Sequence, residues 1–178
     1  MKYLALLRGV NVGGNSIVKM SDLQKAVTTA GFSNVKTYIN SGNVIFESEQ
    51  TDAEKITRTL ENILRKTFNV DSRVVLLTAG QLKKVVDEAP DDWKIPGDLR
   101  CYVAFLFRQV TPAAVIREIK LKEGVDFVNA GQGVVYMTTL LSGITKSGFT
   151  KIIGKPVYKE ITMRNFNTVK KLLELMEF

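Results

Sequence analysis

The order of local patterns is the feature that most constrains how this chain can fold, because strand, helix and hairpin signals follow one another twice. Residues 2–10 form a short apolar run, which is typical of a strand buried on both faces of a sheet. A helix is expected next, from Ser21, which can cap it, to about residue 30, just before Gly31. The chain is therefore expected to begin with a strand and a helix.

A hairpin is predicted after the first helix. Residues 35–39 and 44–46 are rich in β-branched and aromatic residues, and they flank the turn-forming segment Asn40-Ser41-Gly42-Asn43. Asp52 can cap a longer amphipathic helix, after which residues 73–77 indicate another strand. The first half is thus predicted to have the order βαββαβ.

The clearest break in the chain separates two halves. Segment 90–98 combines two prolines, a glycine and acidic residues, and we predict a linker there. It would join an N-terminal α+β half at 1–89 to a C-terminal half at 99–178 that includes a terminal helix. With 178 residues, the chain is long enough to bury a sizeable core either as one domain or as two small domains that share an interface.

The second half repeats the order of the first. Residues 102–107 predict a buried strand, and Pro112 stands where the first turn of a helix begins. Residues 125–128 and 134–138 are expected to pair as a hairpin. A terminal helix follows, which Asn165 can cap and whose apolar residues share one face. These patterns predict an α+β chain of two similar halves.

Composition excludes several classes of protein. The single cysteine, Cys101, and the absence of histidine exclude a zinc site of the usual Cys/His type and fit a reducing compartment. No apolar stretch approaches the roughly 20 residues that span a bilayer, and the first residues do not resemble a signal peptide. We therefore expect a cytoplasmic protein with no membrane partner, and no motif indicates a metal or a cofactor.

The formal net charge of +7 favours anionic partners, so its distribution along the chain matters. Residues 140–171 hold the one basic concentration, with seven Lys and Arg residues against a single acidic residue, Glu160. The seven are Lys146, Lys151, Lys155, Lys159, Arg164, Lys170 and Lys171. This segment predicts a surface that could bind nucleic acid.

Three polar segments are candidates for a ligand site. One is a glycine-containing loop between a strand and a helix, where backbone N–H groups can hold an anion. Another is the hairpin turn, and the last is the start of the terminal helix, where N–H groups lie next to a guanidinium. The candidate binding residues are Arg8, Asn11, Gly13, Gly14 and Asn15 in the loop, Tyr38, Asn40, Ser41, Gly42 and Asn43 in the turn, and Arg164, Asn165 and Thr168 at the helix start. Each segment also has a purely structural interpretation, as a connection, a turn or a capped helix.

Segments 5–14, 37–44 and 164–169 together resemble a family known as domain of unknown function 1697. They read Ala-Leu-Leu-Arg-Gly-Val-Asn-Val-Gly-Gly, Thr-Tyr-Ile-Asn-Ser-Gly-Asn-Val and Arg-Asn-Phe-Asn-Thr-Val. The resemblance runs over essentially the whole chain. It implies bacterial cytosolic proteins with an α+β fold of two ferredoxin-like βαββαβ-type halves, with antiparallel or mixed sheets and a C-terminal helix. It implies no activity and no catalytic residues.

We hypothesise that the three polar segments converge on a pocket for an anionic small molecule or nucleotide, because ligand crevices form at strand ends in α/β sheets. The alternative is a nucleic-acid-binding module that uses residues 140–171 and loses affinity steeply as salt rises. A protein-interaction module that offers a sheet edge or the terminal helix is a third reading. No residue pattern assigns a reaction or an oligomeric state.

Overall fold

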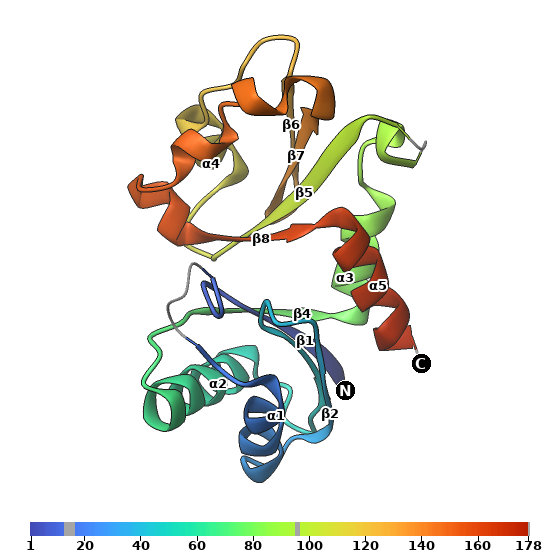
Figure 1. Cartoon of the computed structure of the whole chain (residues 1–178). Helices are drawn as coiled ribbons and strands as arrows, with labels where there is room; N and C mark the ends of the chain where they lie inside the picture. The colour runs from blue at the N-terminus through green and yellow to red at the C-terminus, as the bar shows by residue number, and fades with distance from the viewer. Residues whose placement is uncertain (13–16, 95–96, 178) are drawn as a thin grey trace. The chain divides into compact units, whose positions relative to one another are not determined.

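The computed structural model describes the chain except for residues 13–16, 95–96 and 178. The chain forms two compact units (Figure 1). One comprises Met1–Leu82 together with Leu172–Phe178, and the other comprises Lys83–Lys171. The candidate residues Gly13, Gly14 and Asn15 lie outside the described residues.

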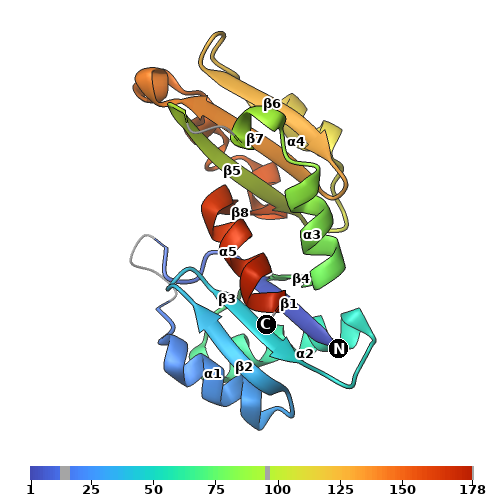
Figure 2. The ribbon, with the colours of Figure 1, turned by 90° about the vertical axis from the view of Figure 1, so that its right-hand side faces the viewer.

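The first unit has the predicted βαββαβ order. Its elements are β1 (Lys2–Leu7), α1 (Met20–Thr29), β2 (Ser33–Tyr38), β3 (Asn43–Glu47), α2 (Ala53–Phe68) and β4 (Val74–Thr78). The strands form an antiparallel sheet in the order β2-β3-β1-β4. Helices α1 and α2 lie against the same face of this sheet (Figure 2). This arrangement is the ferredoxin-like one that the resemblance implied.

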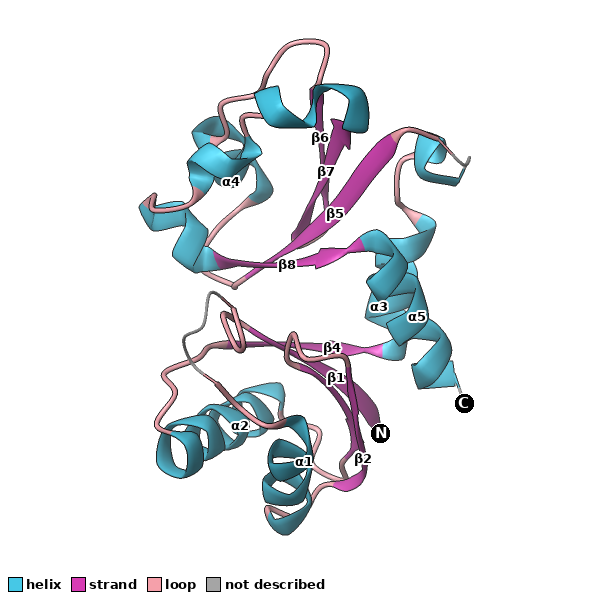
Figure 3. Ribbon diagram, in the orientation of Figure 1, coloured by secondary structure: helices cyan, strands magenta, loops and turns pink. Residues whose placement is uncertain are grey.

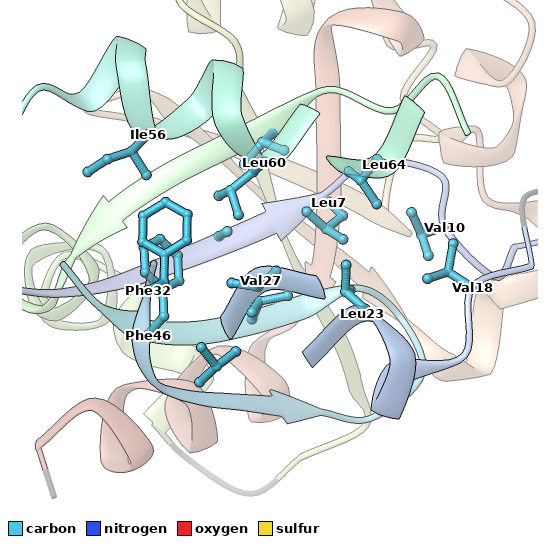
Figure 4. Packing of buried hydrophobic residues seen from close by; sticks show 14 of the residues in the cluster. Leu7, Val10, Val18, Leu23, Val27, Phe32, Phe46, Ile56, Leu60 and Leu64 are labelled. Atoms are coloured by element: carbon cyan, nitrogen blue, oxygen red, sulfur yellow. The ribbon is translucent and has the colours of Figure 1, made fainter. Parts of the chain in front are cut away.

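The central strand β1 explains the apolar run at the start of the sequence. Tyr3, Ala5 and Leu7 belong to the core cluster that α1 and α2 complete, and part of this cluster is drawn in Figure 4. Side chains alternate along a strand, so Leu4 and Leu6 point to the opposite face. Both are fully buried. Burial on both faces therefore requires apolar residues at consecutive positions.

The helix ends agree with the sequence at α2 and differ at α1. Asp52 accepts hydrogen bonds from the backbone N–H groups of Glu54 and Lys55, at 3.0 and 3.1 Å, and so caps α2 as predicted. The prediction that Ser21 caps α1 was wrong. The helix begins at Met20, because the carbonyl of Lys19 already accepts the first helical hydrogen bonds, and Lys19 makes no side-chain cap bond.

The second unit repeats the topology of the first. It contains most of α3 (Ala79–Asp87), η1 (Asp91–Lys94), β5 (Leu99–Leu106), α4 (Pro112–Glu118), β6 (Asp126–Gly131), β7 (Val134–Leu140), η2 (Leu141–Lys146), η3 (Phe149–Ile152), η4 (Pro156–Glu160), β8 (Ile161–Asn165) and the first turns of α5 (Phe166–Glu177). Its antiparallel sheet has the order β6-β7-β5-β8 (Figure 3). The 3-10 helices η2, η3 and η4 stand where α2 stands in the first unit.

Two apolar layers enclose the second sheet. On one face, Val115 and Ile119 from the α4 region and Ile152 from η3 pack against β5 and β7. On the other face, the Trp93 ring packs edge-on against Tyr136 and Phe166, with ring centroids 5.6 and 4.9 Å apart. The sheet is therefore covered on both sides, like its counterpart.

The predicted linker at 90–98 falls within this second unit. Trp93 Nε1 donates a hydrogen bond of 2.7 Å to Thr138 Oγ1, so η1 is fastened to β7. The Tyr136 hydroxyl donates to the carbonyl of Val85 at 2.9 Å, and burial raises the pKa of Tyr136 to about 12. The predicted domain limits stay a prediction. Across the described residues, no helix has both the length and the apolarity needed to cross a membrane.

Candidate functional site

The loop after β1 and the turn between β2 and β3 lie side by side in the first unit. The Asn11 amide nitrogen donates to the carbonyl of Asn40 at 2.8 Å and to that of Val18 at 2.9 Å. Its amide oxygen accepts a hydrogen bond of 2.7 Å from the Val18 N–H. One side chain thus joins both ends of the loop to the hairpin turn, which is an adjacency that the ligand hypothesis required.

Two buried residues of the loop after β1 belong to the core of the first unit. Val10 and Val18, on either side of Asn11, are buried and pack beside Leu7 (Figure 4). Asn11 and its hydrogen-bond partner Val18 are therefore tied to the core of the first unit. Binding residues are commonly found on loops that a rigid scaffold positions.

Two residues of the turn have a structural role. Gly42 has φ +72°, and a Cβ atom there would lie 2.8 Å from the Leu7 Cβ. Its carbonyl accepts a hydrogen bond of 2.8 Å from the Leu7 N–H. Asn43 is fully buried, and its amide donates to the Tyr38 carbonyl and to Ser41 Oγ, at 3.0 Å each. Gly42 and Asn43 therefore shape the turn, while Tyr38, Asn40 and Ser41 are half-buried or exposed.

Each of these two segments holds a non-glycine residue with a positive φ angle. Asn11 has φ +56° and Ile39 has φ +49°. Asparagine tolerates the left-handed region, but a β-branched residue there is a marked outlier. Ile39 is also 49% exposed, so burial of its side chain does not explain its presence. Strain that the fold maintains at an exposed turn is a feature of ligand-binding loops.

Replacing Ile39 with asparagine is expected to stabilise the protein by about 1 kcal/mol, because asparagine enters the left-handed region at lower cost. Urea denaturation followed by circular dichroism measures the change. A loss of stability in Ile39→Asn would contradict the assignment of strain to this residue.

The companion substitution Asn11→Ala removes three hydrogen bonds and is expected to destabilise the protein by about 2 kcal/mol. The same urea denaturation measures this loss.

Two arginines lie at the same end of the first sheet. The Arg8 N–H donates to the Arg73 carbonyl at 3.0 Å, and the Arg8 carbonyl accepts from Ser72 Oγ at 2.8 Å. These bonds extend the β1–β4 ladder beyond its last pair, Leu7 and Val74. Sequence reasoning selected Arg8 and missed Arg73. The signal was available, because antiparallel pairing places the start of β4 beside the end of β1.

The third predicted segment belongs to the second unit. Arg164 lies in β8, opposite Val103 of β5, and is 6% exposed. Its guanidinium donates to Thr162 Oγ1 at 3.0 Å and to the Met163 carbonyl at 2.8 Å. Burial lowers the pKa of Arg164 to about 10, so the side chain remains charged at neutral pH. The alternative of a solvated Arg164 does not hold.

The cap at the start of α5 is confirmed. Asn165 Oδ1 accepts a hydrogen bond of 2.9 Å from the Asn167 N–H, and Thr168 is half-buried in the first turn. The convergence of Arg164, Asn165 and Thr168 with the loop and turn of the first unit stays a prediction.

The seven basic residues of segment 140–171 differ in their surroundings. Arg164 is buried. Lys155 donates to both the backbone carbonyl and the carboxylate of Glu118, at 2.7 and 3.0 Å. The Lys170 ammonium lies 5.4 Å from the centroid of the Phe166 ring. Lys146 and Lys151 are exposed.

Cys101 and the acidic residues Asp87 and Glu88 all lie in the second unit. Cys101 is half-buried, and burial followed by the charge of Asp92 raises its pKa to about 11, which keeps the thiol protonated. Asp87 pairs with Lys83 at 2.6 Å, and Glu88 lies 3.7 Å from Lys84. These groups therefore have structural explanations.

Comparison with known proteins places the chain in a family. A family model described as a protein of unknown function, DUF1697, matches residues 1–136. The chain belongs to the DUF1697 family. A solved structure described as a conserved bacterial protein from Streptococcus pneumoniae is similar, with 25% identity, coverage of 98% of each chain and a TM-score of 0.85. A comparison with curated proteins found no match.

The region matched to the DUF1697 family contains the loop after β1 and the β2–β3 turn, together with Ser72 and Arg73. The family assignment agrees with the sequence resemblance and with the two ferredoxin-like sheets. It supplies no activity, so the function must be argued from the site itself.

Proposed function

We propose that this DUF1697 protein binds an anionic small molecule, of the nucleotide or phosphorylated metabolite class, at the end of the first sheet where β1 ends and β4 begins. The observation that supports this most directly is the hydrogen bond from Asn11 to the Asn40 carbonyl. It joins two of the three candidate segments, and Arg8 and Arg73 lie at the same sheet end.

Charge favours an anion at this position. Arg8 and Arg73 are neighbours across the β1–β4 ladder, so two cationic residues lie at the same end of the sheet. Guanidinium groups bind phosphate and carboxylate in bidentate geometry.

Exposed apolar side chains beside the polar groups favour a nucleotide over a bare phosphate. Val12, Ile17 and Ile39 are 59%, 77% and 49% exposed. Each is one residue away from a member of the hydrogen-bonded group formed by Asn11, Val18 and Asn40. Ligand sites commonly combine apolar contact surface with a few directed polar groups. A base or sugar ring could pack on these side chains while the phosphate meets the arginines.

A thermal-shift screen of nucleotides and phosphorylated metabolites tests the proposal. A ligand present at 100 times its Kd stabilises the folded protein by about 2.7 kcal/mol, which corresponds to a Tm increase of roughly 5–10 °C for a chain of this size. We expect such an increase in the wild type and a much smaller one in Arg8→Ala and Arg73→Ala.

Arg58→Ala is the matched control, because Arg58 is an exposed arginine on α2 that lies away from the sheet end and pairs with the neighbouring Glu54 at 3.6 Å. It should keep the full ligand-dependent increase in Tm. If no compound raises the Tm of any of these proteins, the proposal is wrong. If Arg58→Ala and Arg8→Ala reduce the ligand-dependent increase in Tm equally, binding depends on the net charge of the protein and not on this site.

A further inference from the structure

The buried carboxylate of Asp126 gathers several parts of the second unit. Its Oδ2 accepts hydrogen bonds from the N–H groups of Lys122 and Gly148, at 2.9 and 2.7 Å. Its Oδ1 accepts from Ser147 Oγ at 2.7 Å and from Thr139 Oγ1 at 3.1 Å. The segment after α4, the end of β7 and the turn between η2 and η3 are thus held around one side chain.

This arrangement brings four lysines together that the sequence separates. Lys122 and Ser147 each bond to Asp126, and Lys146 precedes Ser147. The Lys151 N–H donates to the Gly148 carbonyl at 3.0 Å. Gly148 also lies so close to Lys120 that a Cβ atom at this glycine would be 1.6 Å from the Lys120 carbonyl oxygen. We call Lys120, Lys122, Lys146 and Lys151 the lysine cluster.

The side chains of the lysine cluster are all exposed. In the part of the chain that the structure describes, no carboxylate lies within ion-pair distance of their ammonium groups. Some exposed basic residues of the first unit differ, since Lys25, Lys55 and Arg58 each have a carboxylate within 4.0 Å. Glu123 is the exposed acidic residue nearest in sequence, and Asp126 itself is buried. The cluster therefore carries a local excess of positive charge.

We propose that the lysine cluster binds the phosphate backbone of a nucleic acid, without preference for base sequence. The four lysines lie on three separate segments of the second unit, and exposed lysines act as separate, mobile point charges. Both properties suit a row of phosphates better than one small anion, which needs convergent donors. This proposal is independent of the ligand site in the first unit. The proposed surface includes Lys146 and Lys151 from the basic segment 140–171, and it adds Lys120 and Lys122 from the region after α4.

Fluorescence polarisation with a labelled oligonucleotide tests the proposal. One arm uses a single-stranded 20-nucleotide probe and the other the corresponding duplex. If four phosphates are neutralised, the affinity between 50 and 200 mM salt should fall about 50-fold for the single strand and about 150-fold for the duplex. Tighter binding of one probe identifies the form of nucleic acid that the cluster recognises, and no binding of either probe at low salt overturns the proposal.

The test variant replaces all four lysines of the cluster with glutamine, and the control replaces Lys25, Lys55, Arg58 and Arg65 with glutamine. Both variants lose the same formal charge. We expect the cluster variant to lose binding and the control to keep it, while each single lysine substitution lowers the salt slope by about one. Circular dichroism verifies that each variant is folded. Equal weakening in the control variant would show that binding follows net charge and would overturn the proposal.

Discussion

Replacing Gly148 with alanine is expected to unfold the second unit or to destabilise it by about 3 kcal/mol or more. The new methyl group would lie 1.6 Å from the carbonyl oxygen of Lys120, which is a backbone atom and cannot rotate away. Any relief would move the Gly148 N–H, which donates to Asp126 at 2.7 Å. The substitution therefore creates a steric clash and weakens a buried hydrogen bond at once.

Urea denaturation followed by tryptophan fluorescence measures this effect in the relevant unit, because Trp93 is the only tryptophan and is buried in the second sheet's core. Gly80→Ala is the matched control. Gly80 lies in α3, and a Cβ atom there would have no neighbour within 4 Å, so alanine should be neutral or stabilise the helix by up to about 1 kcal/mol. A Gly148→Ala protein of unchanged stability would contradict the packing of η3 against the segment after α4.

Removing the Asp126 carboxylate is expected to have a similarly large effect. Asp126→Ala leaves four hydrogen-bond donors without their acceptor, at an expected cost of about 3–5 kcal/mol at neutral pH. Asp126→Asn retains the shape and one acceptor oxygen, so it should cost about 2 kcal/mol. The same tryptophan measurement reports both variants. A loss below about 1 kcal/mol in Asp126→Ala would show that these bonds do not hold the segments together.

The charge state of Asp126 also predicts a dependence on pH. Burial alone would raise the pKa of this carboxyl, but the hydrogen bonds from Gly148, Ser147, Lys122 and Thr139 outweigh it and lower the pKa below 3.8. Because the pKa is lower in the folded state than in the unfolded state, the ionised carboxylate stabilises the protein above pH 3.8.

That stabilisation is lost as the pH falls through the folded-state pKa of Asp126. The difference in stability between the wild type and Asp126→Asn should therefore be constant near neutral pH and narrow at acidic pH. Denaturation curves at several pH values between neutrality and the acid limit of the folded protein measure it. A difference that stayed constant over the whole range would contradict ionisation of this carboxylate in the folded state.

The two candidate sites depend on the same kind of support from the fold. The site in the first unit depends on Asn11, whose hydrogen bonds hold two connecting segments together at a sheet end. The lysine cluster of the second unit depends on Asp126, which does the same for segments that η2 and η3 separate. In both, one polar side chain fixes loops that secondary structure alone would leave unplaced. Functional groups on loops need this kind of support from a rigid scaffold.

The amino-acid sequence by itself determined most of the strands and α-helices of this protein and their order, whereas β8 and the 3-10 helices were not predicted from local patterns. The apolar run at β1, the cap at Asp52 and the cap at Asn165 are encoded within a few residues of the structure they produce. Local hydrogen bonding and side-chain periodicity produce these features, so local patterns suffice to predict them. The ferredoxin-like arrangement of both halves was likewise implied by the resemblance and agrees with the two sheet orders.

Only the tertiary structure decided which residues share a site. Arg73 lies beside Arg8 because β4 pairs with β1, although 65 positions separate them in the chain numbering. Arginine is usually a surface residue, yet Arg164 is only 6% exposed in β8. The four lysines of the cluster lie near one another because the Asp126 carboxylate accepts hydrogen bonds from segments on either side of the β6–β7 hairpin. Strand pairing and burial depend on the whole sheet at once, and no short stretch of sequence contains that information.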